Sequence, residues 1–285
     1  MSEFRGHAVQ CMSPSGLHTI AYTEWGDPAN PRALVCLHGL SRVGRDFDDL
    51  ARSLAPDYRV VCPDMAGRGQ SSWLRDPASY QIPQYVADMV TVLARVNATT
   101  VHWVGTSMGG LIGMALAAQS ASPIGRMVLN DVGPLLKAAA LNRIGTYIGQ
   151  APLFPDFGAA EAYVRAVSAS FGLTTDAQWK RLTETSLRRV DGGYRMHYDP
   201  AIALPFQAPG AGSADIDLWP LYDAITCPVL VTRGDQSDLL DRATAAAMAA
   251  RGPRATIVEI KGVGHAPMFM DADQIDIVRN FLLNP

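Results

Sequence analysis

Residues 101–115 read VHWVGTSMGGLIGMA, and this stretch contains the strongest local signal in the chain. Its first four residues are an apolar run typical of a buried strand, and the run from Met108 onward is typical of a buried helix. Between them lies the pattern G-x-S-x-G, centred on Ser107. Glycine at 105 and 109 relieves clashes around a strained serine backbone, so the pattern predicts a nucleophile elbow. Ser107 would then lie at a helix N-terminus, where backbone N–H groups can stabilise an oxyanion.

Working outward from the elbow, short apolar runs alternate with helical segments. We expect strands at 4–11, 17–25, 33–37, 58–62, 101–105, 126–130, 229–232 and 255–260, and helices at 47–54, 83–96, 108–119, 242–250 and 274–283. Such alternation predicts an α/β protein with a mostly parallel, eight-stranded sheet covered on both faces. Between 134 and 218 the pattern becomes helical and irregular, for example over 159–169 and 176–190. We therefore expect a core at 1–133 and 219–285, with a helical cap (lid) at 134–218 inserted after the sixth strand.

Composition excludes several classes of protein. The chain has 285 residues, 48% hydrophobic and 18% charged, with a formal net charge of −3, which does not fit a disordered chain. The near-neutral charge gives no reason to expect nucleic acid as a partner. Residues 96–125 contain no Asp, Glu, Lys or Arg, but they are too polar and too rich in glycine to span a membrane.

The cysteines and the N-terminus complete this picture. Cysteines at 11, 36, 62 and 227 lack metal-ligand or redox spacing, so we expect no metal site and no redox pair. Cys36, Cys62 and Cys227 lie in or beside apolar, strand-like runs and are interpreted as small buried hydrophobes; we expect the thiols to be reduced. Residues 1–5 do not resemble a signal peptide, and we expect a cytoplasmic protein whose partner is a small-molecule substrate. The oligomeric state stays open.

Three further motifs accompany the elbow. Leu37-His38-Gly39-Leu40 ends the third strand, and we expect His38 to brace its loop. Residues 64–71 read DMAGRGQS and are interpreted as a turn scaffold with no catalytic role. The motif Gly264-His265 follows the last strand, so His265 completes the chain order Ser…Asp…His.

Together these motifs make the sequence similar to the α/β-hydrolase fold superfamily, in its lid-bearing serine esterase-like branch. The resemblance covers residues 33–133 and 228–285 and is weak over the insertion. It implies no cofactor and hydrolysis through a covalent intermediate on Ser107, with His265 as the base. It also implies an oxyanion hole formed by the backbone N–H groups of Leu40 and Met108.

Four aspartates compete to orient His265. Asp131 follows the sixth strand, where some members of the fold place their acid, although it also suits a turn. Asp241 is better explained as a helix N-cap, and Asp235 as a residue that ties down a tight turn. Asp238 lies deeper in the loop, where related sequences place the acid. We predict the triad Ser107, Asp238 and His265.

The predicted activity is hydrolysis of carboxylic esters with apolar acyl or alkyl groups. Serine at the elbow argues against dehalogenases and epoxide hydrolases, which place aspartate there. Lactonases, perhydrolases and hydrolases of carbon–carbon bonds in ring-cleavage products share the triad and stay as alternatives, as does a non-catalytic ligand-binding protein of this fold. Some apolar residues of the insertion are expected to line the pocket; the set is Leu135, Leu136, Ile144, Tyr147, Ile148, Phe154, Phe157, Phe171, Trp179 and Phe206.

Overall fold

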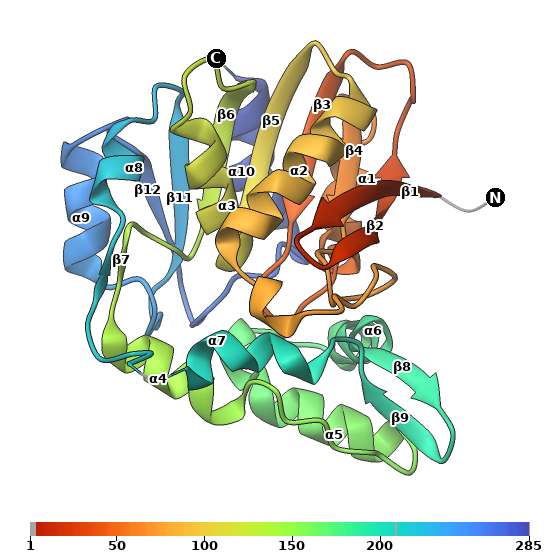
Figure 1. Cartoon of the computed structure of the whole chain (residues 1–285). Coiled ribbons are helices and arrows are strands. Elements are labelled where there is room, and N and C mark those ends of the chain that lie inside the picture. Colours follow the sequence, from red (N-terminus) through yellow and green to blue (C-terminus); the bar gives the residue numbers. More distant parts are fainter. Residues whose placement is uncertain (1–3, 209, 285) are drawn as a thin grey trace.

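A central eight-stranded sheet organises the protein, as a computed structural model describing residues 4–208 and 210–284 shows (Figure 1). Its strands, in spatial order, are β1 (Phe4–Ser13), β2 (Gly16–Trp25), β4 (Arg59–Pro63), β3 (Arg32–Leu37), β5 (Thr100–Thr106), β6 (Ile124–Asn130), β11 (Val229–Gly234) and β12 (Thr256–Ile260). The β1–β2 hairpin pairs antiparallel with β4, and the other neighbouring pairs are parallel. The predicted fold class is confirmed.

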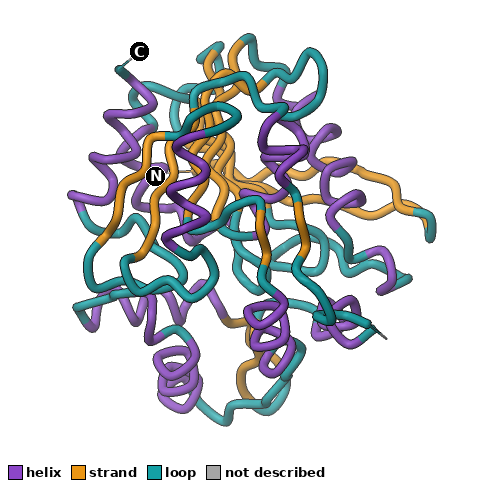
Figure 2. Tube along the Cα trace, turned by 90° about the vertical axis from the view of Figure 1, so that its left-hand side faces the viewer, coloured by secondary structure: helices purple, strands orange, loops and turns teal. Residues whose placement is uncertain are grey.

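Helices cover both faces of this sheet (Figure 2). One face packs against α1 (Asp48–Leu54) and α10 (Ala272–Leu283). The other packs against α2 (Ile82–Val96), α3 (Met108–Ala117), α8 (Trp219–Asp223) and α9 (Arg242–Ala250). Consecutive strand residues serve opposite faces: Leu34 joins the first core and Val35 the second, and both are fully buried. This two-sided burial explains why the central strands are apolar throughout.

Local sequence signals set the helix ends. Asp241 caps α9 by accepting the Thr244 N–H at 2.6 Å, as predicted. At the end of α2, Asn97 adopts a left-handed conformation, φ 49°, which Asn tolerates better than most residues. Within the described residues, short 3₁₀ segments also occur at η1 (Gly44–Phe47), η2 (Pro77–Ser79), η3 (Ala169–Phe171) and η4 (Pro200–Ala203).

A cap inserted after β6 lies across one end of the sheet (Figure 1). It contains β7 (Leu135–Leu136), α4 (Ala138–Tyr147), α5 (Phe157–Val167), α6 (Asp176–Ser186), β8 (Leu187–Val190), β9 (Gly193–Met196), α7 (Leu204–Gln207) and β10 (Ile216–Asp217). The helix predicted over 176–190 ends at Ser186, and a β8–β9 hairpin follows. The Asp191-Gly192 turn favours that hairpin, since Gly192 adopts φ 81°.

The predicted strand and helix over residues 96–125 are present as β5 and α3. Among the residues that the structure describes, no helix combines the length and apolar character needed to cross a membrane. The prediction that the chain lacks a signal peptide concerns residues 1–5, of which 1–3 lie outside the described residues.

Candidate active site

Ser107 lies at the junction of β5 and α3, with φ 51° and ψ −115°, the strained backbone expected of an elbow. A Cβ atom on Gly105 would lie 2.4 Å from the backbone of Gly109. A Cβ atom on Gly109 would lie 2.1 Å from the Leu37 carbonyl oxygen. Both contacts are impossible, so the elbow requires glycine at each position, as the motif predicts.

His265 contacts an aspartate that follows β6. Its Nδ1 lies 2.7 Å from Oδ2 of Asp131, whose side chain is fully buried. The other carboxylate oxygen accepts the Gly234 N–H at 2.9 Å, and Oδ2 also accepts the Ser237 hydroxyl at 2.6 Å. These contacts hold the carboxylate in one orientation. Because an ionised carboxylate only accepts hydrogen bonds, Nδ1 donates and Nε2 is left as the basic nitrogen.

The prediction that Asp238 orients His265 is wrong. The Asp238 side chain is 54% exposed and pairs with Arg143 of α4 at 2.8 Å. The cause is the turn after β11, in which the Ser237 N–H bonds the Gly234 carbonyl at 3.0 Å. This turn directs Ser237 toward Asp131 and leaves the next residue facing the cap. Asp235 ties two loops together by accepting the Gly262 N–H at 2.9 Å, not through its own turn.

Asn130 joins the elements that carry the site, although no motif in the sequence indicates this role. Its amide donates to the Thr106 hydroxyl at 2.9 Å and to the Pro267 carbonyl at 2.8 Å. Its side-chain oxygen accepts the Thr232 hydroxyl at 2.9 Å. One fully buried amide therefore links the elbow, β11 and the loop of His265. The available signal is a polar residue directly before Asp131 at the end of an apolar strand.

The predicted oxyanion residues adjoin the elbow. Leu40 and Met108 line the same cavity as Ser107. The preceding His38 is fully buried; its Nδ1 bonds the Gly39 carbonyl at 2.7 Å and its Nε2 accepts the Met65 N–H at 2.9 Å. Burial lowers the pKa of His38 to about 3, so its ring stays neutral. His38 braces its loop, as predicted.

Arg68 places a buried positive charge beside Leu40 and Met108, the two predicted oxyanion residues. Its Nε donates to the Leu40 carbonyl at 2.8 Å, and its Nη2 lies 3.7 Å from the Met108 sulfur. Another guanidinium nitrogen donates to the Tyr85 hydroxyl at 2.7 Å. Residues 64–71 are therefore more than the predicted turn scaffold. Asp64 fills that predicted role by accepting two backbone N–H groups, and Arg68 also bonds the loop that carries Leu40.

Two cavities meet at Ser107. The smaller, about 150 Å³, is lined by His265, Arg143 and Asp238 as well as Ser107. The larger, about 540 Å³, is mostly apolar. Of the insertion residues predicted to line a pocket, Ile144, Tyr147, Ile148 and Phe171 line the smaller cavity, and Leu136, Ile144 and Phe206 line the larger one.

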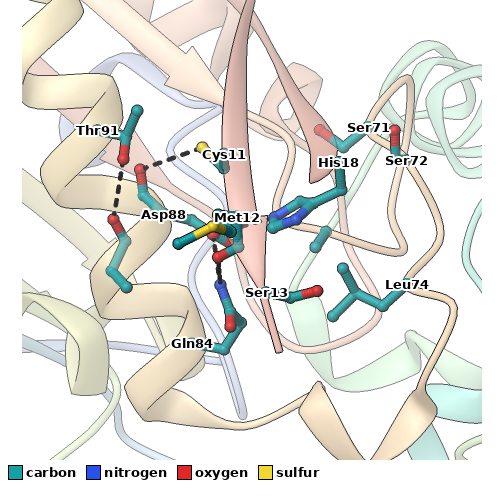
Figure 3. A network of polar contacts seen from close by, with 12 residues as sticks. Cys11, Met12, Ser13, His18, Ser71, Ser72, Leu74, Gln84, Asp88 and Thr91 are labelled. Carbon is teal, nitrogen blue, oxygen red and sulfur yellow. Dashed lines mark hydrogen bonds and ion pairs between the residues drawn. The ribbon is translucent and has the colours of Figure 1, made fainter. Parts of the chain in front are cut away.

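A separate polar cluster lies at the β1–β2 hairpin (Figure 3). Cys11, His18 and Asp88 place potential metal-ligating atoms within 4.8 Å of one another. His18 Nε2 lies 3.0 Å from Asp88 Oδ1, which also accepts a hydrogen bond from Gln84 at 2.8 Å. Burial raises the pKa of the Cys11 thiol to about 11 and favours its protonated form. We interpret the cluster as a hydrogen-bonded clamp between the hairpin and α2.

Comparisons with known proteins agree with this fold. Residues 34–276 match the model of the alpha/beta hydrolase family. The chain is 54% identical over 282 residues to a 3-hydroxybutyrate-oligomer hydrolase of Cupriavidus necator, covering 96% of each chain. It also resembles the crystal structure of an alpha/beta hydrolase from Novosphingobium aromaticivorans (TM-score 0.88, 38% identity, 99% of each chain). The crystal structure of a putative hydrolase from Rickettsia typhi aligns with a TM-score of 0.91 at 32% identity over 99% of each chain.

Proposed function

The chain belongs to the alpha/beta hydrolase family, and from that premise we propose that it hydrolyses short linear oligomers of 3-hydroxy acids such as 3-hydroxybutyrate. It is a carboxylic ester hydrolase, and each link in such an oligomer is a carboxylic ester. The observation that carries the substrate class is the 54% identity, over 96% of both chains, to the Cupriavidus necator oligomer hydrolase. The large apolar cavity beside Ser107 supports it, because it offers room for several units of an aliphatic polyester chain.

The proposed chemistry uses Ser107 as nucleophile and His265 as general base. His265 Nε2 takes the hydroxyl proton of Ser107 as its oxygen bonds the substrate carbonyl carbon. Asp131 holds the Nδ1–H and stabilises the imidazolium, in place of the predicted Asp238. The carbonyl oxygen becomes an oxyanion, which the backbone N–H groups of Leu40 and Met108 bind. One such donor contributes about 3 kcal/mol to the transition state.

Collapse of this intermediate breaks the ester bond. His265 gives its proton to the leaving alcohol oxygen, and the acyl group stays on Ser107. Water then enters, loses a proton to His265 and attacks the acyl carbon. The acid product leaves when Ser107 regains that proton, so the enzyme ends as it began.

We also propose that the cap spans residues 134–218 and roofs both cavities. Two contacts support these limits: β7 pairs with β10, and the Leu218 N–H bonds the Pro134 carbonyl at 2.7 Å. The ends of the insertion therefore meet beside the sheet. A cytoplasmic location stays a prediction.

The test is hydrolysis of linear 3-hydroxybutyrate trimer by the purified protein, with products separated by chromatography. We expect Ser107→Ala to lower turnover by about a thousandfold or more and to abolish labelling by a fluorophosphonate. The matched control is Ser120→Ala, at an exposed serine, which should keep full activity.

Two results would refute the proposal at different points. Undiminished labelling of Ser107→Ala would exclude this nucleophile. A wild-type protein that cleaves p-nitrophenyl butyrate and a lactone or a ring-cleavage dienoate, but leaves the trimer intact, would exclude the substrate class.

A further inference from the structure

Arg143 brings a positive charge into the active site from the cap. It projects from α4 and lines the smaller cavity together with Ser107 and His265. Tyr147, one turn further along α4, lines the same cavity; burial raises its pKa, and the nearby Arg143 charge partly offsets that effect. One face of α4 therefore carries both Arg143 and Tyr147 into the cavity.

The partner of Arg143 is readily displaced. Asp238 meets it at 2.8 Å, yet its side chain is 54% exposed, and exposed ion pairs gain little over hydration by water. Arg42, the other arginine of this cavity, is different. Its guanidinium binds both oxygens of Asp46 at 2.8 and 2.7 Å and the Ser186 hydroxyl at 2.7 Å, all buried. Of the two arginines that line this cavity, Arg143 is therefore the one that can exchange Asp238 for another carboxylate.

The proton transfer from His265 to the leaving alcohol determines which part of the substrate lies near Arg143. The leaving alcohol oxygen must receive its proton from His265, so the alcohol portion lies in the cavity that His265 lines, with Arg143. Met108, a proposed oxyanion donor, lines the larger apolar cavity, which takes the acyl portion. In a 3-hydroxy acid ester, two carbons separate the alcohol oxygen from the next carboxyl group. When the last unit leaves, that group is a free carboxylate within the same small cavity.

We propose that Arg143 binds the terminal carboxylate of the leaving 3-hydroxy acid, and that Asp238 holds the guanidinium in place when the site is empty. This inference rests on the proposed function and deepens it. The enzyme then removes units from the carboxyl end of the oligomer, because only that end presents a carboxylate beside the scissile ester. Bidentate pairing suits arginine to this role better than lysine.

The test compares linear 3-hydroxybutyrate trimer with its methyl ester, in which the terminal carboxylate is neutral. We expect Arg143→Gln to raise KM for the free trimer about tenfold, which is the effect of losing one charge-assisted hydrogen bond. KM for the methyl ester should stay nearly unchanged. Arg143→Lys should restore part of the loss. Asp238→Asn should lower KM for the free trimer, since it removes the competing carboxylate. p-Nitrophenyl butyrate reports the chemistry without a carboxylate.

The matched control is Lys137→Gln, which removes another exposed cap cation, one that pairs with Asp215 at 3.3 Å. Lys137→Gln should change KM neither for the trimer nor for its methyl ester. An equal loss on the trimer and its methyl ester in Arg143→Gln would overturn the carboxylate site while leaving the proposed function intact. Wild-type protein inactive on both trimers but active on p-nitrophenyl butyrate would overturn both. Melting curves for each variant identify any that fail to fold.

Discussion

Replacing Asp131 with asparagine tests the proposed triad of Ser107, His265 and Asp131 most directly. The side chain is fully buried, and its Oδ1 accepts the Gly234 N–H at 2.9 Å. In Asp131→Asn the amide oxygen keeps that contact, so the NH₂ group faces Ser237 and His265. An NH₂ group only donates, so His265 must accept at Nδ1 and carry its proton on Nε2. That tautomer cannot accept the Ser107 proton.

The expected loss follows from this change of tautomer. The corresponding substitution in the serine-protease template lowers turnover by about 10⁴, equal to about 5.4 kcal/mol of transition-state stabilisation at about 1.36 kcal/mol per tenfold. Folding should survive, because the substitution preserves shape and the Ser237 hydroxyl can rotate to accept a hydrogen bond. We expect the loss in kcat for p-nitrophenyl butyrate, with KM little changed.

The matched control is Asp238→Asn, measured with the same ester. Because its carboxylate contacts Arg143, this variant should keep kcat within about twofold, the scale of a surface ion pair. Circular dichroism and thermal melting establish that both variants are folded. Equal activity of wild type and folded Asp131→Asn, or a large loss confined to Asp238→Asn, would refute the reasoning.

Three further predictions address the surroundings of the triad. Asn130→Ala should lower kcat about 10- to 100-fold with KM nearly constant, because the loop of His265 loses its anchor; unchanged kcat in a folded variant would contradict this. The lowered pKa of His38 should make stability fall as pH drops below the unfolded value of about 6.5 toward the folded value of about 3. Between pH 7.5 and 4.5, urea unfolding should show wild type losing about 3 kcal/mol more than His38→Gln, and parallel profiles would exclude that linkage. Phe206→Ala should enlarge the apolar cavity and shift preference among p-nitrophenyl esters toward longer acyl chains. Phe157→Ala, at a cap residue packed against Tyr194, should cause no such shift. The same shift in both variants would argue against placing the acyl chain in the larger cavity.

The strands and the elbow were predictable because both are local patterns. A strand that is buried on both faces appears in the sequence as a short apolar run. The elbow appears as two glycines around Ser107, because larger residues would clash at those positions. The acid was not predictable in this way. Asp131 and Asp238 both follow strands next to the site, and the choice depends on a turn that redirects one side chain.

The same limit applies to residues that act across several elements. Asn130 bonds partners up to 137 positions away, and Arg143 meets Asp238 only after the cap folds back over the sheet. The hairpin β8–β9 is a milder case, in which the Asp-Gly turn is visible in the sequence but the helical periodicity continues through it. Long-range pairing, not residue type, determines these features.

The proposed acid, Asp131, directly follows β6 and lies outside the cap. Asp131 and His265 both belong to the loops that adjoin the sheet, whereas Arg143 belongs to the cap and reaches the core at Asp238. The cap also contacts the loop of His265, because the Gly264 N–H bonds the Ser170 carbonyl at 2.6 Å and the Ser170 hydroxyl donates to the His265 carbonyl at 3.2 Å. The Asp131 carboxylate, in contrast, is fixed by Gly234 and Ser237, which both lie outside the cap. Breaking the Arg143–Asp238 ion pair therefore removes none of the contacts that fix the carboxylate beside His265.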